Sequence, residues 1–86
     1  MKHSKSSNFG RCYASLPMVV QKLADKNFDL LKANPQHPSL HFKKTGKYRS
    51  IRIGRVYRAL AVEHTDGLIW FWIGTHSDYD RMISQA

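Results

Sequence analysis

The sequence predicts an α+β fold: an N-terminal helix hairpin packed on an antiparallel sheet of three or four strands, with a short C-terminal helix after the sheet. Apolar residues recur at helical spacing before residue 34, three apolar or alternating runs follow between residues 48 and 73, and helical spacing returns after residue 76. Helices that are segregated from an antiparallel sheet are typical of the α+β class. With 86 residues the chain can bury one modest core, so a single domain over residues 1–86 is expected.

Two helices are expected before residue 35. The shorter one covers residues 8–15 and follows residues 1–7, which are expected to be frayed; its apolar residues are Phe9, Cys12, Tyr13 and Leu16. Pro17 suits the first turn of a second, longer helix. The apolar stripe of the second helix is formed by Val20, Leu23, Ala24, Phe28 and Leu31. This helix is expected to end at Asn34, because the residue before a proline is pushed out of helical geometry.

The sheet is expected to begin with an outer strand over residues 40–44 and to continue as a meander over residues 48–53, 56–62 and 68–74. Residues 68–73 are all bulky and apolar, which is typical of a strand covered on both faces near the middle of a sheet. Asp66-Gly67 is a strong turn signal before this strand.

A short helix is expected after the sheet. Ser77 can cap its N-terminus, with Asp78 and Asp80 favourably placed in the first turn. Its apolar stripe would be formed by Tyr79, Met82, Ile83 and Ala86.

The hairpin after residue 48 decides which way two arginines point. Residues that face each other across a hairpin share one face of the sheet, and a three-residue loop over residues 54–56 sets Arg52 opposite Arg58 and Ile53 opposite Tyr57. A two-residue turn would instead place Arg58 among apolar side chains, and an unpaired buried charge costs several kcal/mol. The three-residue loop is therefore predicted, with both arginines on the open face of the sheet, away from the core.

The charge pattern favours a polyanionic partner. The formal net charge is +8, and eight Lys and Arg residues with no Asp or Glu lie between Leu30 and Val62. Because such an excess is expensive in self-repulsion, a nucleic acid is the first expected partner, an acidic protein the second and a membrane surface a distant third. The single Cys12 rules out an internal disulfide and fits a cytoplasmic protein. No apolar run approaches the ~20 residues of a membrane span, and the polar start does not resemble a signal peptide.

Several reaction classes lack the residue patterns that they need. The five histidines and one cysteine show no zinc-ligand spacing, the six acids are too scattered for two-metal hydrolysis or a glycosidase pair, and no glycine-rich phosphate loop is present. No metal or cofactor is therefore expected. Cations, imidazoles and phenols remain, and these are the groups that cleave RNA by attack of the ribose 2′-hydroxyl on its own phosphate.

The candidate catalytic residues for this chemistry are Arg52, Arg58, His76 and Tyr79. The two arginines would steady the pentavalent phosphorane, and the imidazole and the phenol, which follow the last strand, would transfer protons. The competing interpretations are a helix-flanking residue without a chemical role for His76 and a packing role in the last helix for Tyr79. The residues expected to bind RNA around them are His41, Lys43, Lys44, Lys47, Arg49 and Arg55.

The joint order and spacing of five segments resemble the RelE/ParE superfamily of type II toxin–antitoxin toxins. The matching segments are residues 16–17, 37–44, 50–54, 57–60 and 69–76, followed by Asp78-Tyr-Asp80. In the nucleases of this family the site is formed by the arginine before the hairpin, the arginine of a Tyr-Arg pair, and basic or phenolic groups after the last strand. The resemblance places these roles on Arg52, Arg58, His76 and Tyr79.

The resemblance implies a toxin that is neutralised by an acidic antitoxin protein. RelE-like members cleave mRNA in the ribosomal A site without metal, whereas ParE-like members inhibit DNA gyrase. The leading hypothesis is a metal-independent, ribosome-dependent mRNA endonuclease that inhibits translation. The alternatives are a gyrase inhibitor that acts by protein binding and a basic nucleic-acid-binding module, although such a module would be expected to display exposed stacking aromatics on its sheet.

Overall fold

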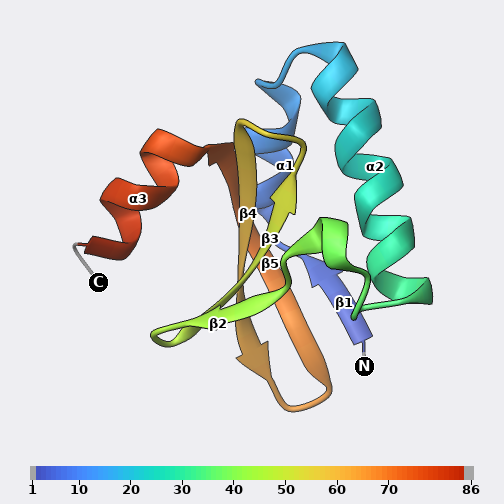
Figure 1. The fold of residues 1–86 in the computed structure, drawn as a ribbon. Helices are drawn as coiled ribbons and strands as arrows, with labels where there is room; N and C mark the ends of the chain where they lie inside the picture. The colour runs from blue at the N-terminus through green and yellow to red at the C-terminus, as the bar shows by residue number, and fades with distance from the viewer. Residues whose placement is uncertain (1, 85–86) are drawn as a thin grey trace.

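The computed structural model describes residues 2–84 and confirms the α+β class (Figure 1). The elements follow in the order β1 (Lys2–Lys5), α1 (Ser7–Ala14), α2 (Met18–Ala33), the 3₁₀ helix η1 (Pro38–Leu40), β2 (Lys43–Thr45), β3 (Tyr48–Ile53), β4 (Tyr57–His64), β5 (Gly67–Thr75) and α3 (His76–Ser84). The strands form one sheet in the order β1-β5-β4-β3-β2. Figure 1 shows α1 and α2 on one face of this sheet and α3 on the other. No helix among the described residues is long and apolar enough to cross a membrane.

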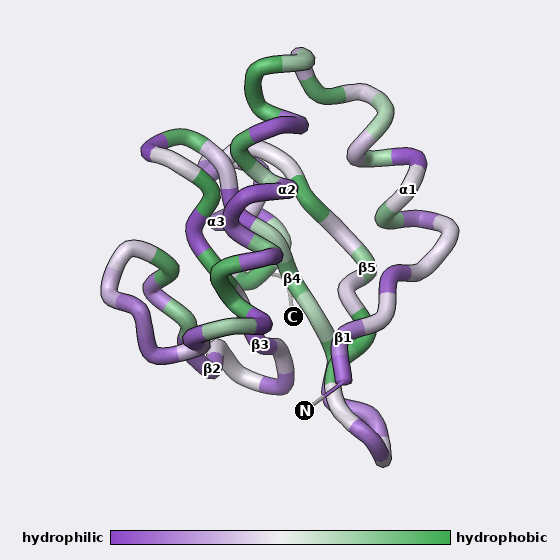
Figure 2. The backbone as a smooth tube through the Cα atoms, turned by 90° about the vertical axis from the view of Figure 1, so that its right-hand side faces the viewer, coloured by the Kyte–Doolittle hydropathy of each residue, from purple (hydrophilic) through white to green (hydrophobic). Residues whose placement is uncertain are grey.

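The expectation that residues 1–7 are frayed is wrong for the part that the structure describes. Lys2–Lys5 forms β1, which pairs in parallel with β5, so the sheet has five strands and is mixed; Met1 lies outside the described residues. The pairing requires a glycine at residue 67, where a Cβ atom would lie 2.0 Å from the carbonyl oxygen of Lys2. The strand was not predicted because its residues are hydrophilic, as the colour of β1 in Figure 2 shows, and they contain no hydrophobic periodicity.

One imidazole connects β1 to the core. Nδ1 of His3 accepts a hydrogen bond from Nε1 of the buried Trp70 at 3.0 Å, and the two rings stack with centroids 6.1 Å apart. Burial, followed by the charges of the N-terminal amine and Lys32, lowers the pKa of His3 below its ordinary value of 6.5. The fold therefore favours the neutral imidazole, because a proton on Nδ1 would break the bond to Trp70.

We expect the stability of the protein to fall as the pH drops below about 6.5. A lowered folded-state pKa means that the stabilisation is complete above the unfolded pKa and is lost as the pH falls through the folded pKa. His3→Gln keeps an acceptor for Trp70 but cannot titrate, so urea unfolding between pH 7 and 5 should show a shallower loss of stability. The difference should stay below the ~1.4 kcal/mol per pH unit of one full proton, since the ring is partly solvated. His64→Gln, at an exposed residue, is the matched control, and an equal slope in wild type and His3→Gln would contradict this role.

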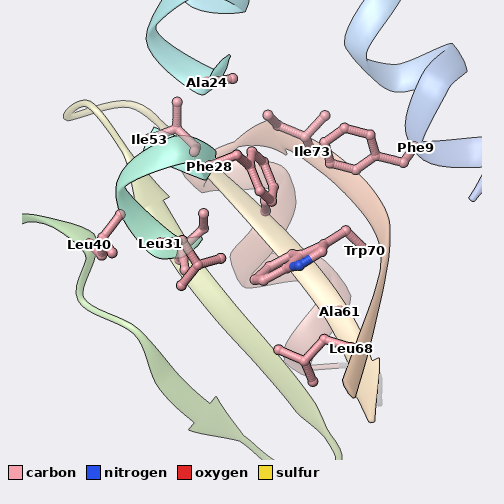
Figure 3. Packing of buried hydrophobic residues seen from close by; sticks show 12 residues of the cluster. Phe9, Ala24, Phe28, Leu31, Leu40, Ile53, Ala61, Leu68, Trp70 and Ile73 are labelled. Atoms are coloured by element: carbon pink, nitrogen blue, oxygen red, sulfur yellow. The ribbon is translucent and has the colours of Figure 1, made fainter. Parts of the chain in front are cut away.

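The core lies between the sheet and the first two helices (Figure 3). At its centre Phe28 makes edge-to-face pairs with Phe9 and with Trp70, at distances of 5.5 and 5.1 Å between the ring centroids. The buried hydrophobic residues around them are Ala24, Leu31, Leu40, Ile51, Ile53, Ala59, Ala61, Leu68 and Ile73. The predicted apolar stripe of the second helix is confirmed for Ala24, Phe28 and Leu31, whereas Leu23 is exposed.

The register of β3 with β4 agrees with the predicted three-residue loop. Arg52 pairs with Arg58 and Ile53 pairs with Tyr57, while residues 54–56 form the turn. Gly54 has φ +63°, a conformation that glycine adopts without steric cost.

β5 lies inside the sheet, between β1 and β4, as its apolar sequence predicts. The pairing of β4 with β5 contains a β-bulge. Leu60 pairs with Trp72 and the next residue, Ala61, pairs with Trp70, so Phe71 has no partner on β4. This bulge brings both Trp70 and Ile73 into the helix-side core, although they are three residues apart.

Two element boundaries differ from the prediction. The outer strand β2 begins at Lys43, because Pro38–Leu40 forms the 3₁₀ helix and His41 has φ +45°, which ends that helix. The N-terminus of α3 is capped by Thr75 instead of Ser77: the backbone N–H of Asp78 donates to Oγ1 of Thr75 at 3.2 Å. Tyr79 is the buried residue of α3, and the predicted member Ala86 of its stripe lies outside the described residues.

Candidate functional site

The face of the sheet that carries α3, called the α3 face from here on, holds the candidate residues. Residues that pair across the sheet share a face, so Lys43 lies with Ser50, Thr45 with Tyr48, and Arg52 with Arg58. The Tyr79 hydroxyl contacts Ser50 and Thr45, which identifies this face as the one covered by α3. Three of the four predicted catalytic residues therefore meet on one face, and His76 begins the helix that covers it.

Arg58 is buried and does not lie on an open face as predicted. It is only 4% exposed, and the ring of Tyr79 covers its guanidinium at 4.9 Å from the carbon to the ring centroid. Among the described residues its Nε atom has no hydrogen-bond partner. The three-residue loop does place Arg58 on the predicted face, but the C-terminal helix folds back over that face and covers it.

Tyr79 is fixed from two sides. Its hydroxyl lies 3.2 Å from Oγ1 of Thr45 and 3.5 Å from Oγ of Ser50, and its ring lies on Arg58. Burial by itself would raise the pKa of Tyr79. The hydrogen bonds to Ser50 and Thr45 and the charges of Arg58 and Lys43 together outweigh it, so the pKa lies below the ordinary value of 10.0. At 2% exposure the phenol is not accessible to a substrate in this conformation.

His76 is the exposed one of the two candidates for proton transfer. Its side chain is 51% exposed, and Nδ1 lies 3.1 Å from Oδ2 of Asp80, one helical turn later. The ring packs edge-on against Tyr79 with centroids 5.6 Å apart. Its backbone N–H donates to the carbonyl of Val56 at 2.5 Å, which ties the start of α3 to the β3–β4 turn.

The Arg52 side chain contacts the same β3–β4 turn. Nε donates to the carbonyl of Gly54 at 2.9 Å, and Nη1 donates to Nε2 of His41 at 3.3 Å. Arg55 occupies the exposed tip of this turn. Figure 1 shows the turn at one end of the sheet, next to the beginning of α3. The group of Arg52, His41, Arg55 and His76 is called the turn cluster from here on; it offers cations and imidazoles to solvent above the buried Arg58–Tyr79 pair.

The other predicted RNA-binding residues are divided between the two faces. Lys43 is on the α3 face and Lys47 is in the turn between β2 and β3. Lys44 and Arg49 pair with each other across the strands on the opposite face, where Nζ of Lys44 and Nε of Arg49 lie 4.0 and 3.1 Å from a carboxylate oxygen of Glu63. The structure therefore does not bring Lys44 and Arg49 to the turn cluster.

Three supporting residues escaped the sequence analysis. Ser50 and Thr45 hold the Tyr79 hydroxyl, and Asp80 orients His76. The signal for Ser50 was its alternation with Arg52 along one strand, and the signal for Asp80 was its place four residues after His76 on a helix. Thr45 had no comparable signal. Among residues 2–84, no three His, Cys, Asp or Glu side chains are grouped closely enough to hold a metal ion.

The comparisons with known proteins agree with this fold. A family model described as ParE-like toxin domain matches residues 19–81. The chain is similar to the toxin in the RelB-RelE antitoxin-toxin complex from Methanococcus jannaschii, with a TM-score of 0.69, 20% identity, and coverage of 91% of this chain and 96% of the other. It is also similar to the isolated E. coli RelE toxin, with a TM-score of 0.62, 10% identity and coverage of 96% and 95%. YafQ from E. coli has a TM-score of 0.63, 16% identity and coverage of 91% and 96%. The search of curated proteins gave no match.

Proposed function

The chain belongs to the ParE-like toxin domains of the RelE/ParE superfamily, and on this premise we propose that it is a metal-independent endoribonuclease that cleaves mRNA on the ribosome and so inhibits translation. The observation that carries the proposal is the turn cluster: the Arg52 side chain donates to the carbonyl of Gly54 and the backbone N–H of His76 to the carbonyl of Val56, which attaches both residues to the same turn. An anion-binding guanidinium and an exposed imidazole at one place are what phosphate cleavage by an internal hydroxyl requires.

In the proposed reaction His76 removes the proton of the ribose 2′-hydroxyl, and the resulting alkoxide attacks the adjacent phosphorus. Arg52 donates to the phosphate oxygens while their charge increases, since it is partly exposed and oriented by Gly54 and His41. The bond from phosphorus to the 5′-oxygen then breaks, and the imidazolium formed in the first step returns its proton to that oxygen. Arg58 and Tyr79 support the reaction from below by holding positive charge and the His76 ring in place.

A gyrase inhibitor is the second candidate, and two adjacent exposed apolar residues favour it. Met18 and Val19 at the start of α2 are 70% and 75% exposed. Neighbouring exposed apolar residues mark protein-binding surfaces more often than nucleic-acid sites. Such a toxin would act by binding a protein and would not depend on the imidazole of His76.

One experiment separates the two candidates. The wild-type chain and His76→Gln are expressed from a tightly repressed promoter, and the rate of amino-acid incorporation and the supercoiling of a reporter plasmid are followed after induction. The proposal predicts that incorporation fails first and that His76→Gln restores it. Early loss of supercoiling in both chains would overturn the nuclease in favour of the gyrase inhibitor.

We also expect a tight complex with a small acidic antitoxin. The cations between Leu30 and Val62 should steer the encounter, so association should slow as salt rises. Apolar contacts to Met18 and Val19 should keep the complex together at high salt, because burial of apolar area is not screened. A kinetic titration with the protein encoded next to this one, from low to high ionic strength, tests both statements. A neighbour that binds without relieving growth arrest would contradict the toxin–antitoxin pairing.

A further inference from the structure

A small cavity next to the proposed site has no role in the chemistry described so far. It holds about 240 Å³ and lies between the β2–β3 turn and the end of α3, lined by Thr45, Gly46, Lys47, Tyr48 and Ile83. Thr45 belongs both to this cavity and to the contact with the Tyr79 hydroxyl, so the cavity adjoins the Arg58–Tyr79 pair directly. Its volume is below the ~300–1,000 Å³ that drug-sized ligands occupy, which suits a single planar ring.

The wall of this cavity is an aromatic ring that a second ring holds in position. Tyr48 is half-buried on the α3 face, and its ring centroid lies 5.3 Å from that of Phe71 at an interplanar angle of 51°. The bulge in β5 adds Phe71 to this side of the sheet. The ammonium of Lys47 lies 5.5 Å from the Tyr48 ring centroid, and no Asp or Glu lines the cavity. An oriented aromatic ring beside a free cation is the usual arrangement for stacking a base of single-stranded nucleic acid and holding its phosphate.

We propose that this cavity binds one nucleobase of single-stranded RNA by stacking on Tyr48, with Lys47 at the neighbouring backbone phosphate. The proposal rests on the proposed function, because the base would belong to the same RNA that is cleaved at the turn cluster. Tyr48 and Ser50 are two residues apart on β3, about 7 Å, and Ser50 touches Tyr79. Tyr48 and Arg52 are four residues apart on β3, about 13 Å, and α3 covers the sheet between them. A base bound at Tyr48 therefore does not adjoin the cleaved nucleotide but holds the same RNA farther along its chain.

Binding is measured without cleavage, on the His76→Gln chain, by fluorescence anisotropy with a labelled single-stranded RNA decamer. Tyr48→Leu keeps an apolar side chain against Phe71 but removes the ring, and we expect it to weaken binding roughly ten- to hundredfold. Tyr48→Phe should restore most of the affinity, because stacking needs the ring and not the hydroxyl. Lys47→Ala should lower the salt dependence of binding by about one ion, whereas Lys26→Ala, at an exposed residue of α2, should not.

Decamers with one abasic position, placed in turn along the RNA, test for a base contact. Removing the base at one position should weaken binding to the chain that keeps Tyr48 and should not weaken binding to Tyr48→Leu. Equal losses of affinity in both chains would overturn the subsite. Single-turnover cleavage on ribosomes separates this proposal from the proposed function. RNA binding that depends on Tyr48, without any cleavage, would refute the nuclease and keep the subsite. If Tyr48→Leu instead binds and cleaves RNA as well as the wild-type chain does, the subsite alone is refuted. If no RNA binds and Tyr48→Leu weakens the antitoxin complex instead, the cavity receives a protein side chain and the proposal is wrong.

Discussion

Arg58→Met should reduce mRNA cleavage by roughly 10²–10³-fold while the protein stays folded. The methionine keeps an apolar stem beneath Tyr79 but removes the positive charge. Losing one group that stabilises a developing oxyanion typically lowers the rate by two to three orders of magnitude. The fold should tolerate the change, because Arg58 is a buried cation whose Nε has no partner among the described residues. Losing the contact with the Tyr79 ring costs about 0.5–2 kcal/mol, and the lost desolvation penalty offsets it.

Spectroscopic titration of tyrosine tests how Arg58 acts. The charge of Arg58 is one cause of the lowered pKa of Tyr79, so the Tyr79 phenol should titrate at higher pH in Arg58→Met. The signal of Tyr79 is identified as the one that is absent from Tyr79→Phe. Arg58→Lys should keep part of this shift, and Arg11→Met, at an exposed residue of α1, is the control for losing one arginine. If cleavage falls while the Tyr79 titration does not move, Arg58 does not act through Tyr79. Full activity in Arg58→Met would remove Arg58 from the site.

The helix-side half of the fold could be predicted because its residues follow simple periods. Phe28 and Leu31 recur at helical spacing, and the alternation of Ile51 and Ile53 with Arg52 fixes both the register and the face. The first strand lacked such a pattern: Lys2–Lys5 is held by backbone hydrogen bonds to β5 and by the contact of His3 with Trp70, and neither leaves a hydrophobic period. Hydrogen bonds between distant backbone segments are invisible to any local pattern.

The sequence could predict which candidate residues share a face of the sheet, but not which of them are buried. The strand register places Arg52 and Arg58 side by side, but Arg52 is partly exposed whereas Arg58 is buried. The difference arises because α3 packs over Arg58, with the Tyr79 hydroxyl in contact with Ser50 and Thr45. Similarly, a count of cations could not separate Lys43 from Lys44, although they point to opposite faces and only Lys44 meets Glu63. The number of cations shows only that the surface is basic. The strand register and the packing of the helices decide which of these cations are exposed on the same face.

His76→Gln should slow single-turnover cleavage on programmed ribosomes by roughly 10²–10⁴-fold, which is the usual contribution of a general acid–base group. The side chain of His76 is 51% exposed, so the loss should leave the unfolding free energy nearly unchanged. His64→Gln, at an exposed residue of β4 outside the turn cluster, controls for the removal of an imidazole.

The dependence of the rate on Asp80 and on metal ions decides whether the imidazole acts chemically. Asp80→Asn removes the carboxylate that holds Nδ1 of His76, so it should lower the rate, but less than His76→Gln does. Since the proposed chemistry uses only cations and imidazole, exchanging Mg²⁺ for another divalent ion that keeps the ribosome assembled should leave the rate unchanged. A rate that changes with the identity of this ion would instead require ligands contributed by the RNA or the ribosome, because residues 2–84 bring no three potential metal ligands together, and His76 would then be an orienting residue.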